Sequence, residues 1–379
     1  MASRLKSLDW LRGLMALSIM LYHLRDRHES ATVLGKLGMY GVSIFFILSG
    51  LSMAIAYDRY IKDVRSAGFF FIRRLFRIWP LMWLAVACVA VPAYLHGEPR
   101  SAGEIAMNLS TLFGFVAPTH YMNMGAWSIG NEMVYYALTP LLIAAYHYRR
   151  WLGNSMTLLA MTIGILFAFR LLNPQMPIES QWEVYVNPFN NLFLYCMGLA
   201  IYYTFRDSKI PSRWYIGLLL AAAAAFALYP SAGDQIHIVT GIPRVVFSLI
   251  SVAIVLAFWK CPPLLPSVIG DRLEQLGVAT YGVYLLHPIV MQWTQKRLRV
   301  LGIFEPHLFV LLVVGITISL ALLTYRFLES PLTQLGKRIT QVRPRLTDSA
   351  KIEGGVPSLI TCGTSPDPQP ENAGNLPAI

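Results

Sequence analysis

Apolar runs of near membrane-spanning length dominate this 379-residue chain and limit what it can fold into. A helix that crosses a bilayer needs roughly 20 predominantly apolar residues in succession. Runs of about this length cover residues 9–25, 38–57, 78–95, 127–147, 152–172, 188–205, 213–229, 242–259, 275–294 and 306–328. The sequence therefore predicts an all-α, polytopic transmembrane bundle of about ten helices.

The charge content supports a membrane protein and excludes nucleic acid as a partner. Charged residues make up 13% of the chain, whereas soluble domains average about 25%. The formal net charge is +11, but the basic residues stand in short segments between apolar runs. This pattern is typical of loops that anchor a membrane protein, not of a DNA-binding face. The four cysteines show no paired spacing, so neither a disulfide nor a metal site is predicted.

The distribution of Lys and Arg predicts the orientation. If the N-terminus lies inside, the cytoplasmic segments carry most of the basic residues, including the dense connection 58–77 and the pair Arg149 and Arg150. The outer segments carry few, among them Arg25, Arg100 and the group at 296–299. This bias and the even number of runs predict that both termini are cytoplasmic.

Three segments of the chain depart from the pattern of long apolar runs. The short apolar run 105–116 is expected to form an interfacial or re-entrant helix. Residues 326–331, RFLESP, are expected to end the last helix with a charged pair and a proline stop. The membrane domain is assigned to residues 1–337. Residues 338–379 become polar and rich in Pro, Gly and Ser, so a disordered cytoplasmic tail is predicted.

The first apolar run carries Asp9 and Arg12 near its start and His23 near its end. Eleven helical residues separate Arg12 from His23, which places both on nearly the same face, roughly 16 Å apart. Ionisable groups at such depth are costly and commonly functional. An imidazole with a pKa of about 6.5 suits a general base, so His23 is a catalytic candidate. The alternative is a buried histidine that is hydrogen-bonded to a neighbouring helix.

Two further ionisable residues are predicted at a depth similar to that of His23. Glu132 follows Trp127 by five residues in the fourth run, and His287 lies in the ninth. The alternative for Glu132 is a structural role, in which it would pair with a buried arginine such as Arg170 or Arg244. His287 precedes a proline, so its alternative role is to cap a break in that helix.

A cluster of arginines begins the third run. Arg73, Arg74 and Arg77 occur in the segment FFFIRRLFRIWP, residues 69–80, and Arg73 and Arg77 share one helix face. They can clamp one anionic group, such as a phosphate-bearing donor. Positive-inside anchoring is the alternative. The segment GVSIFFILSG, residues 41–50, is expected to form a helix-packing seam because it combines small residues.

Six motifs in order resemble the membrane-bound acyltransferase family 3, integral-membrane O-acyltransferases of bacterial glycans. They are LDWLRGLMALSIMLYH, FFILSG, RRLFRIWP, WSIGNEMVYY, YGVYLLH and FLESP, and the resemblance covers the chain from about Leu8 to Lys337. The resemblance implies a ten-helix enzyme that moves an acyl group, commonly acetyl, from cytoplasmic acyl-coenzyme A to a carbohydrate hydroxyl. It implies a location in the bacterial inner membrane. Acyl-coenzyme A would be a co-substrate, with no permanently bound cofactor, and the partners would be a carbohydrate or glycolipid acceptor and membrane lipid.

The resemblance also implies roles for individual residues. Arg12 and His23 match the family's paired Arg and His, and Arg73, Arg74 and Arg77 match its coenzyme-binding arginines. The residues themselves favour His23 as the base, with Glu132 or Asp9 fixing the histidine tautomer or balancing Arg12.

His287, Trp127 and Asp9 complete the expected site as substrate-binding residues. The chief rival function is a transporter or flippase, because polar groups at matched depth also line transport pathways.

Overall fold

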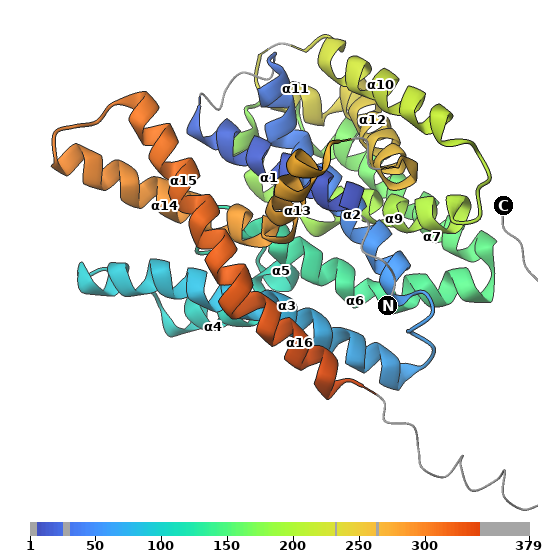
Figure 1. Ribbon diagram of the computed structural model, residues 1–379, viewed down its shortest axis with the longest axis horizontal. Helices are drawn as coiled ribbons and strands as arrows, with labels where there is room; N and C mark the ends of the chain where they lie inside the picture. The colour runs from blue at the N-terminus through green and yellow to red at the C-terminus, as the bar shows by residue number, and fades with distance from the viewer. Residues whose placement is uncertain (1–5, 26–30, 232, 263–264, 342–379) are drawn as a thin grey trace, which may run out of the picture. The chain divides into compact units, whose positions relative to one another are not determined.

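The computed structural model describes residues 6–25, 31–231, 233–262 and 265–341, and every regular element in these ranges is helical (Figure 1). The long helices are α1 (Lys6–Leu24), α2 (Val33–Tyr57), α3 (Val64–Leu95), α6 (Ala126–Tyr148), α7 (Arg150–Leu166), α9 (Pro188–Phe205), α10 (Ser212–Leu228), α12 (Gly241–Lys260), α14 (Thr280–Val300) and α15 (Pro306–Thr324). The shorter elements are α4 (Ala102–Ser110), α5 (Phe113–Val116), η1 (Phe167–Leu171), η2 (Ile178–Gln181), α8 (Trp182–Val186), α11 (Ile236–Val239), α13 (Ser267–Val278), η3 (Tyr325–Glu329) and α16 (Ser330–Ile339). The all-α prediction is confirmed for the described residues.

Each predicted apolar run overlaps one long helix. Five segments are long and apolar enough to cross a membrane, and these are α2, α3, α7 with η1, α12, and α15 through α16. The short run 105–116 forms α4 and α5 instead of a long helix. The total of ten spans and the orientation remain predictions.

The ninth run differs from its prediction at two points. Its expected start at 275 lies inside α13, and the chain breaks at Ala279 before α14 begins. The break adjoins the place where α1 crosses, because a Cβ at Gly277 would lie 2.0 Å from the carbonyl oxygen of Asp9. Conversely, α14 continues through Pro288, so the helix break expected there is absent.

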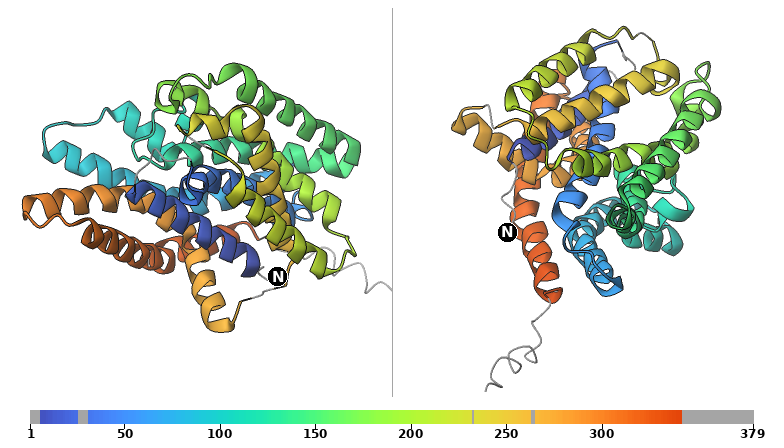
Figure 2. Two further views of the ribbon diagram at one scale, coloured as in Figure 1. Left: turned by 90° about the horizontal axis from the view of Figure 1, so that it is seen from above. Right: turned by 90° about the vertical axis from the view of Figure 1, so that its right-hand side faces the viewer.

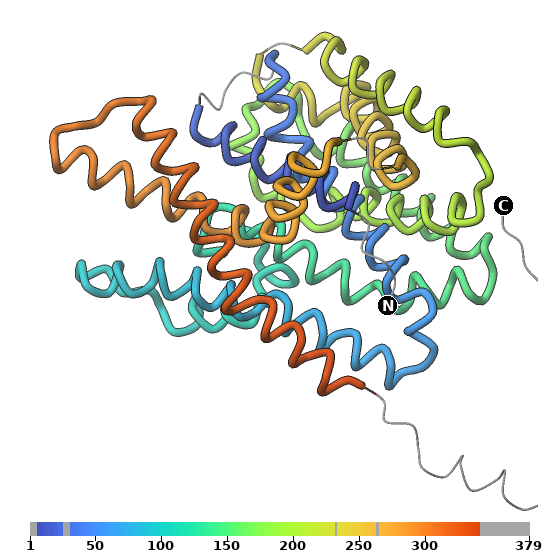
Figure 3. The backbone as a smooth tube through the Cα atoms, in the orientation of Figure 1, coloured from blue at the N-terminus to red at the C-terminus, as the bar shows by residue number. Residues whose placement is uncertain are grey.

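The C-terminal helices also differ from the prediction. Pro331 does not end the helical part of the chain, because it lies in the first turn of α16, where a missing N–H is tolerated. Glu329 pairs with Arg77 of α3 and not with Arg326. Figure 3 shows α16 crossing α3, against which it packs. The helix extends to Ile339, two residues into the predicted tail, and residues 342–379 lie outside the described part of the chain.

Glycines let α2 approach its neighbours closely. A Cβ at Gly50 would lie 2.0 Å from the carbonyl oxygen of Tyr195 in α9, and one at Gly198 would lie 2.2 Å from that of Ile47. Gly38 lies against the ring of Tyr22 in α1. The predicted packing seam at 41–50 is therefore confirmed. Helix α1 packs against α2, α13 and α14, as two further views show (Figure 2).

A buried carboxylate joins the end of α2 to α6 and α9. Asp58 accepts hydrogen bonds from Tyr203 at 2.7 Å and Tyr202 at 3.2 Å, and it contacts Nε2 of His147 at 2.7 Å. Arg206 completes the cluster with an ion pair at 3.2 Å. Burial raises the pKa of Asp58, but the bonds from Tyr203 and His147 outweigh it and keep the pKa below its usual value.

Candidate active site

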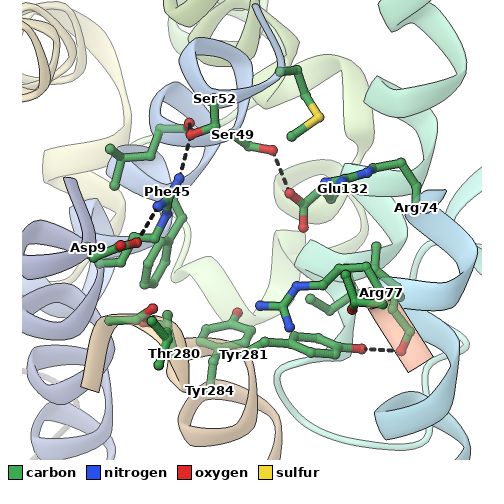
Figure 4. Close-up of a pocket in the computed structure, with 18 of the residues that line it drawn as sticks. Asp9, Phe45, Ser49, Ser52, Arg74, Arg77, Glu132, Thr280, Tyr281 and Tyr284 are labelled. Carbon is green, nitrogen blue, oxygen red and sulfur yellow. Dashed lines mark hydrogen bonds and ion pairs between the residues drawn. The ribbon is translucent and has the colours of Figure 1, made fainter. Parts of the chain in front are cut away.

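A cavity of about 690 Å³ lies among α1, α2, α3, α6, α14 and α16 (Figure 4). Its ionisable wall consists of four cations and two carboxylates, which are Arg12, Arg74, Arg77, Lys337, Asp9 and Glu132. This volume falls in the range of roughly 300–1,000 Å³ that is typical of small-molecule sites. The excess of cations suits an anionic ligand.

Helix α1 contributes an ion pair to this wall. Arg12 binds the carboxylate of Asp9 at 2.8 Å, one turn earlier, and it also donates to the hydroxyl of Ser52 in α2. Asp9 is buried, so its pairing with a cation offsets much of the cost of removing its charge from water. The expectation that Asp9 balances Arg12 is confirmed.

Helix α3 presents Arg74 and Arg77 to the cavity, whereas Arg73 is absent from its lining. Arg73 instead donates to the hydroxyl of Thr340 at 2.6 Å and lies 4.1 Å from the ring centre of Tyr60. The pair that faces the cavity is thus Arg74 with Arg77 and not the expected pair of Arg73 with Arg77.

The two arginines differ in how they are held. Arg77 pairs with Glu329, while Arg74 donates to the hydroxyl of Tyr57 at 2.7 Å. Neither Arg74 nor Lys337 forms an ion pair within the described residues. Two atoms at this wall, Nε of Arg74 and Oγ1 of Thr333, are buried and have no hydrogen-bond partner in this part of the chain. Such groups are suited to binding a polar ligand or water.

Glu132 lies on the opposite wall. Its Oε1 accepts hydrogen bonds from Ser49 and from Tyr136, both at 2.5 Å. The alternative pairing with Arg170 or Arg244 is not found. Arg244 donates to the carbonyl oxygen of Asn190 at 2.6 Å.

The two histidines form a separate pair. Nδ1 of His23 lies 2.9 Å from Nε2 of His287, with ring planes 13° apart. The two histidines, which were predicted at similar depth on separate helices, therefore lie side by side. His287 is 1% exposed, and its Nδ1 lies 3.0 Å from the carbonyl oxygen of Val283.

Glu132 does not belong to the histidine pair, contrary to the prediction of a common depth. Gly38 of α2 is level with Tyr22, the neighbour of His23, and Ser49 of α2 binds Glu132. Eleven helical residues separate Gly38 from Ser49, or roughly 16 Å. Glu132 therefore does not fix the histidine tautomer.

An aromatic layer lies between the cavity and the histidines. The rings of Phe45 and Tyr284, which both line the cavity, are 6.1 Å apart, and the ring of Tyr284 is also 6.1 Å from that of His287. Ser128 donates a bond of 2.8 Å to the hydroxyl of Tyr284. The expected single site thus has two parts, a cationic cavity and a histidine pair, which meet at Tyr284.

Trp127 belongs to neither part. Its side chain is 6% exposed and packs edge-on against Phe46 and Trp182, at ring distances of 6.3 and 5.9 Å. A substrate-binding role for Trp127 has no support from this position. The sequence reasoning missed Ser128 and Tyr284, although each lies one turn before a residue that it selected, Glu132 and His287 respectively.

The apolar helices and the ionisable groups buried among them define a multi-pass membrane protein. The chain belongs to the family described as "Acyltransferase domain", whose model matches residues 5–326. It is thus a member of a family of enzymes that transfer acyl groups.

The chain is also similar to several curated proteins. The chain is 26% identical over 361 residues to "Peptidoglycan O-acetyltransferase OatA" of Listeria monocytogenes, which covers 87% of this chain and 56% of the relative. "Exopolysaccharide production protein ExoZ" of Rhizobium meliloti is 25% identical over 330 residues, which cover 84% of this chain and 96% of the relative. "Putative peptidoglycan O-acetyltransferase YrhL" of Bacillus subtilis is 26% identical, with 87% and 55% covered. The chain spans about half the length of OatA and YrhL. No solved structure matches significantly.

Proposed function

We propose that this protein is a membrane O-acyltransferase that moves an acetyl group from acetyl-coenzyme A to a hydroxyl of a polysaccharide. Family membership supports acyl transfer, and the names of the relatives point to polysaccharide acceptors. The single observation that carries the donor assignment is the cavity walled by Arg12, Arg74, Arg77 and Lys337.

The donor would place its phosphates against Arg74 and Arg77. Guanidinium groups bind phosphate through paired hydrogen bonds, and the unsatisfied Nε of Arg74 offers one more donor. Lys337 would add a point charge from α16. The acyl end of the donor would have to pass Phe45 and Tyr284 to approach the histidine pair.

His23 acts as the general base in this proposal. Its ring takes the proton of the acceptor hydroxyl as the oxygen attacks the thioester carbonyl, a step typically worth about 10²–10⁴-fold. A C–O bond forms and the C–S bond breaks. The proton then passes from His23 to the departing thiolate, so the base is restored.

The topology completes the proposal. With ten spans and both termini inside, the cationic cavity opens toward the cytoplasm, where acyl-coenzyme A is found, and the histidines lie deeper in the inner membrane. The membrane domain of this proposal extends to the end of α16 at Ile339, and the tail that follows is placed in the cytoplasm.

Transfer of radiolabelled acetyl from acetyl-coenzyme A to glycan tests this function. Membranes with the wild type, His23→Ala, Arg74→Ala and the matched control Arg73→Ala are compared at equal protein levels. We expect label with the wild type and Arg73→Ala, and its loss with His23→Ala. A protein that moves a glycan without incorporating label, whatever acyl donor is offered, would show a transporter instead.

A further inference from the structure

The histidine pair forms a directed chain of hydrogen bonds. The carbonyl oxygen of Val283 can only accept, so Nδ1 of His287, 3.0 Å away, must donate to it. A neutral imidazole with its proton on Nδ1 has its lone pair on Nε2. Nε2 of His287 therefore accepts from Nδ1 of His23 at 2.9 Å.

Burial supports the neutral form of His287 in this chain. The residue is 1% exposed, and its neighbours along α14 include the buried Leu286 and Ile289. An imidazolium in such surroundings loses its hydration without gaining an anionic partner. The opposite direction of the hydrogen bond would require a cationic His287 and is disfavoured.

The sequence of α14 contributes to this arrangement. Pro288 has no N–H, so the carbonyl oxygen of Tyr284, four residues earlier, lacks its usual helical donor. Carbonyl oxygens of the turn that precedes His287, with that of Val283 at 3.0 Å, thus place negative partial charge near its Nδ1, which stabilises the proton there.

We propose that His287 is a positioning residue that holds His23 in the tautomer protonated on Nδ1, which leaves the lone pair on Nε2. The inference rests on the proposed function, in which His23 is the general base, and assigns Nε2 as its reacting atom. When Nε2 takes the acceptor's proton, the Nδ1 proton of the imidazolium faces a neutral nitrogen acceptor. The positive charge stays on His23, where the hydrogen bond from Nδ1 to His287 stabilises it until Nε2 gives its proton to the thiolate.

Two substitutions separate positioning from packing. His287→Leu removes the acceptor, whereas His287→Gln keeps an amide oxygen that can accept from His23. We expect His287→Leu to lower kcat by about 10- to 100-fold, a part of the contribution of a general base. His287→Gln should restore part of this loss. The KM for acetyl-coenzyme A should stay unchanged in both variants, because His287 does not line the cavity.

Nitrogen NMR of ¹⁵N-histidine-labelled protein in lipid vesicles reads the tautomer without any assay of activity. The His23 signals are assigned by their loss in His23→Asn. The proposal expects a proton on Nδ1 of His23 in the wild type and a loss of this preference in His287→Leu. A wild type protonated on Nε2, or a His287→Leu variant with unchanged tautomer and kcat, would overturn it. Acyl transfer by His23→Ala would refute the base instead, while the NMR result would still report the pairing.

Discussion

Ser49 of α2 donates a hydrogen bond of 2.5 Å to Glu132 of α6, and this bond joins two walls of the cationic cavity. Tyr136 donates to the same carboxylate oxygen at 2.5 Å. Glu132 is therefore fixed on the cavity side of the aromatic layer formed by Phe45 and Tyr284, away from the histidines.

The charge of Glu132 can be removed while its hydrogen bonds are kept. In Glu132→Gln the amide oxygen still accepts from Ser49 and Tyr136, so we expect the fold to persist. We expect kcat to fall by at least about tenfold, the loss expected when a catalytic carboxylate is neutralised. The KM for acetyl-coenzyme A should not rise, because the substitution removes a negative charge from a cavity that would bind an anion. Steady-state acetyl transfer measures both, with Ser49→Ala as the variant that keeps the charge. An unchanged kcat would remove Glu132 from the catalytic site.

Arg74 and Arg73 are adjacent in sequence but only Arg74 lines the cavity. We expect Arg74→Ala to raise the KM for acetyl-coenzyme A by about 10- to 100-fold, since a hydrogen bond to a charged group is worth about 1.5–3 kcal/mol. Arg73→Ala should leave this KM within about twofold, because it loses only its contacts with Thr340 and Tyr60. Equal effects of the two substitutions would contradict the assignment of the donor site to the cavity.

Lys337 and Arg338 form a second adjacent pair, on α16, in which only Lys337 lines the cavity. We expect Lys337→Ala to raise the KM for the donor by about two- to fivefold, the effect of one solvated charge. The effect should shrink as salt is added, because salt screens such a charge. Arg338→Ala is the control. A donor KM that responds to Arg338→Ala as much as to Lys337→Ala would show a diffuse surface effect.

Gly50 tests the packing of α2 on α9. A Cβ there would lie 2.0 Å from a backbone oxygen of Tyr195, whereas a Cβ at Gly315 of α15 would meet nothing within 4 Å. Gly50→Ala should destabilise the fold by about 1–3 kcal/mol or more through overpacking. Gly315→Ala should be neutral or stabilising by up to about 1 kcal/mol, because alanine favours helices. Thermal unfolding in detergent compares the two, and an equal Tm would contradict the close approach.

Local sequence patterns determined the helices of this protein. Run length and apolar content depend only on neighbouring residues, so each of the ten predicted runs overlaps a long helix. The i, i+3 pair of Asp9 and Arg12 was equally accessible, because one turn of helix sets their separation. Local patterns did not predict the helix break at Ala279. This break lies where α1 crosses close to Gly277, and no local sequence signal marks it.

Only the tertiary structure decided which side chains meet. Sequence could not pair His23 with His287, because 264 residues separate them and their contact depends on how α1 and α14 pack. It could not choose Arg74 over Arg73, since the rotation of α3 about its axis is set by its neighbours. Helix formation is a local property of the chain, whereas the facing of one helix toward another depends on close contacts such as that of Gly50 with Tyr195.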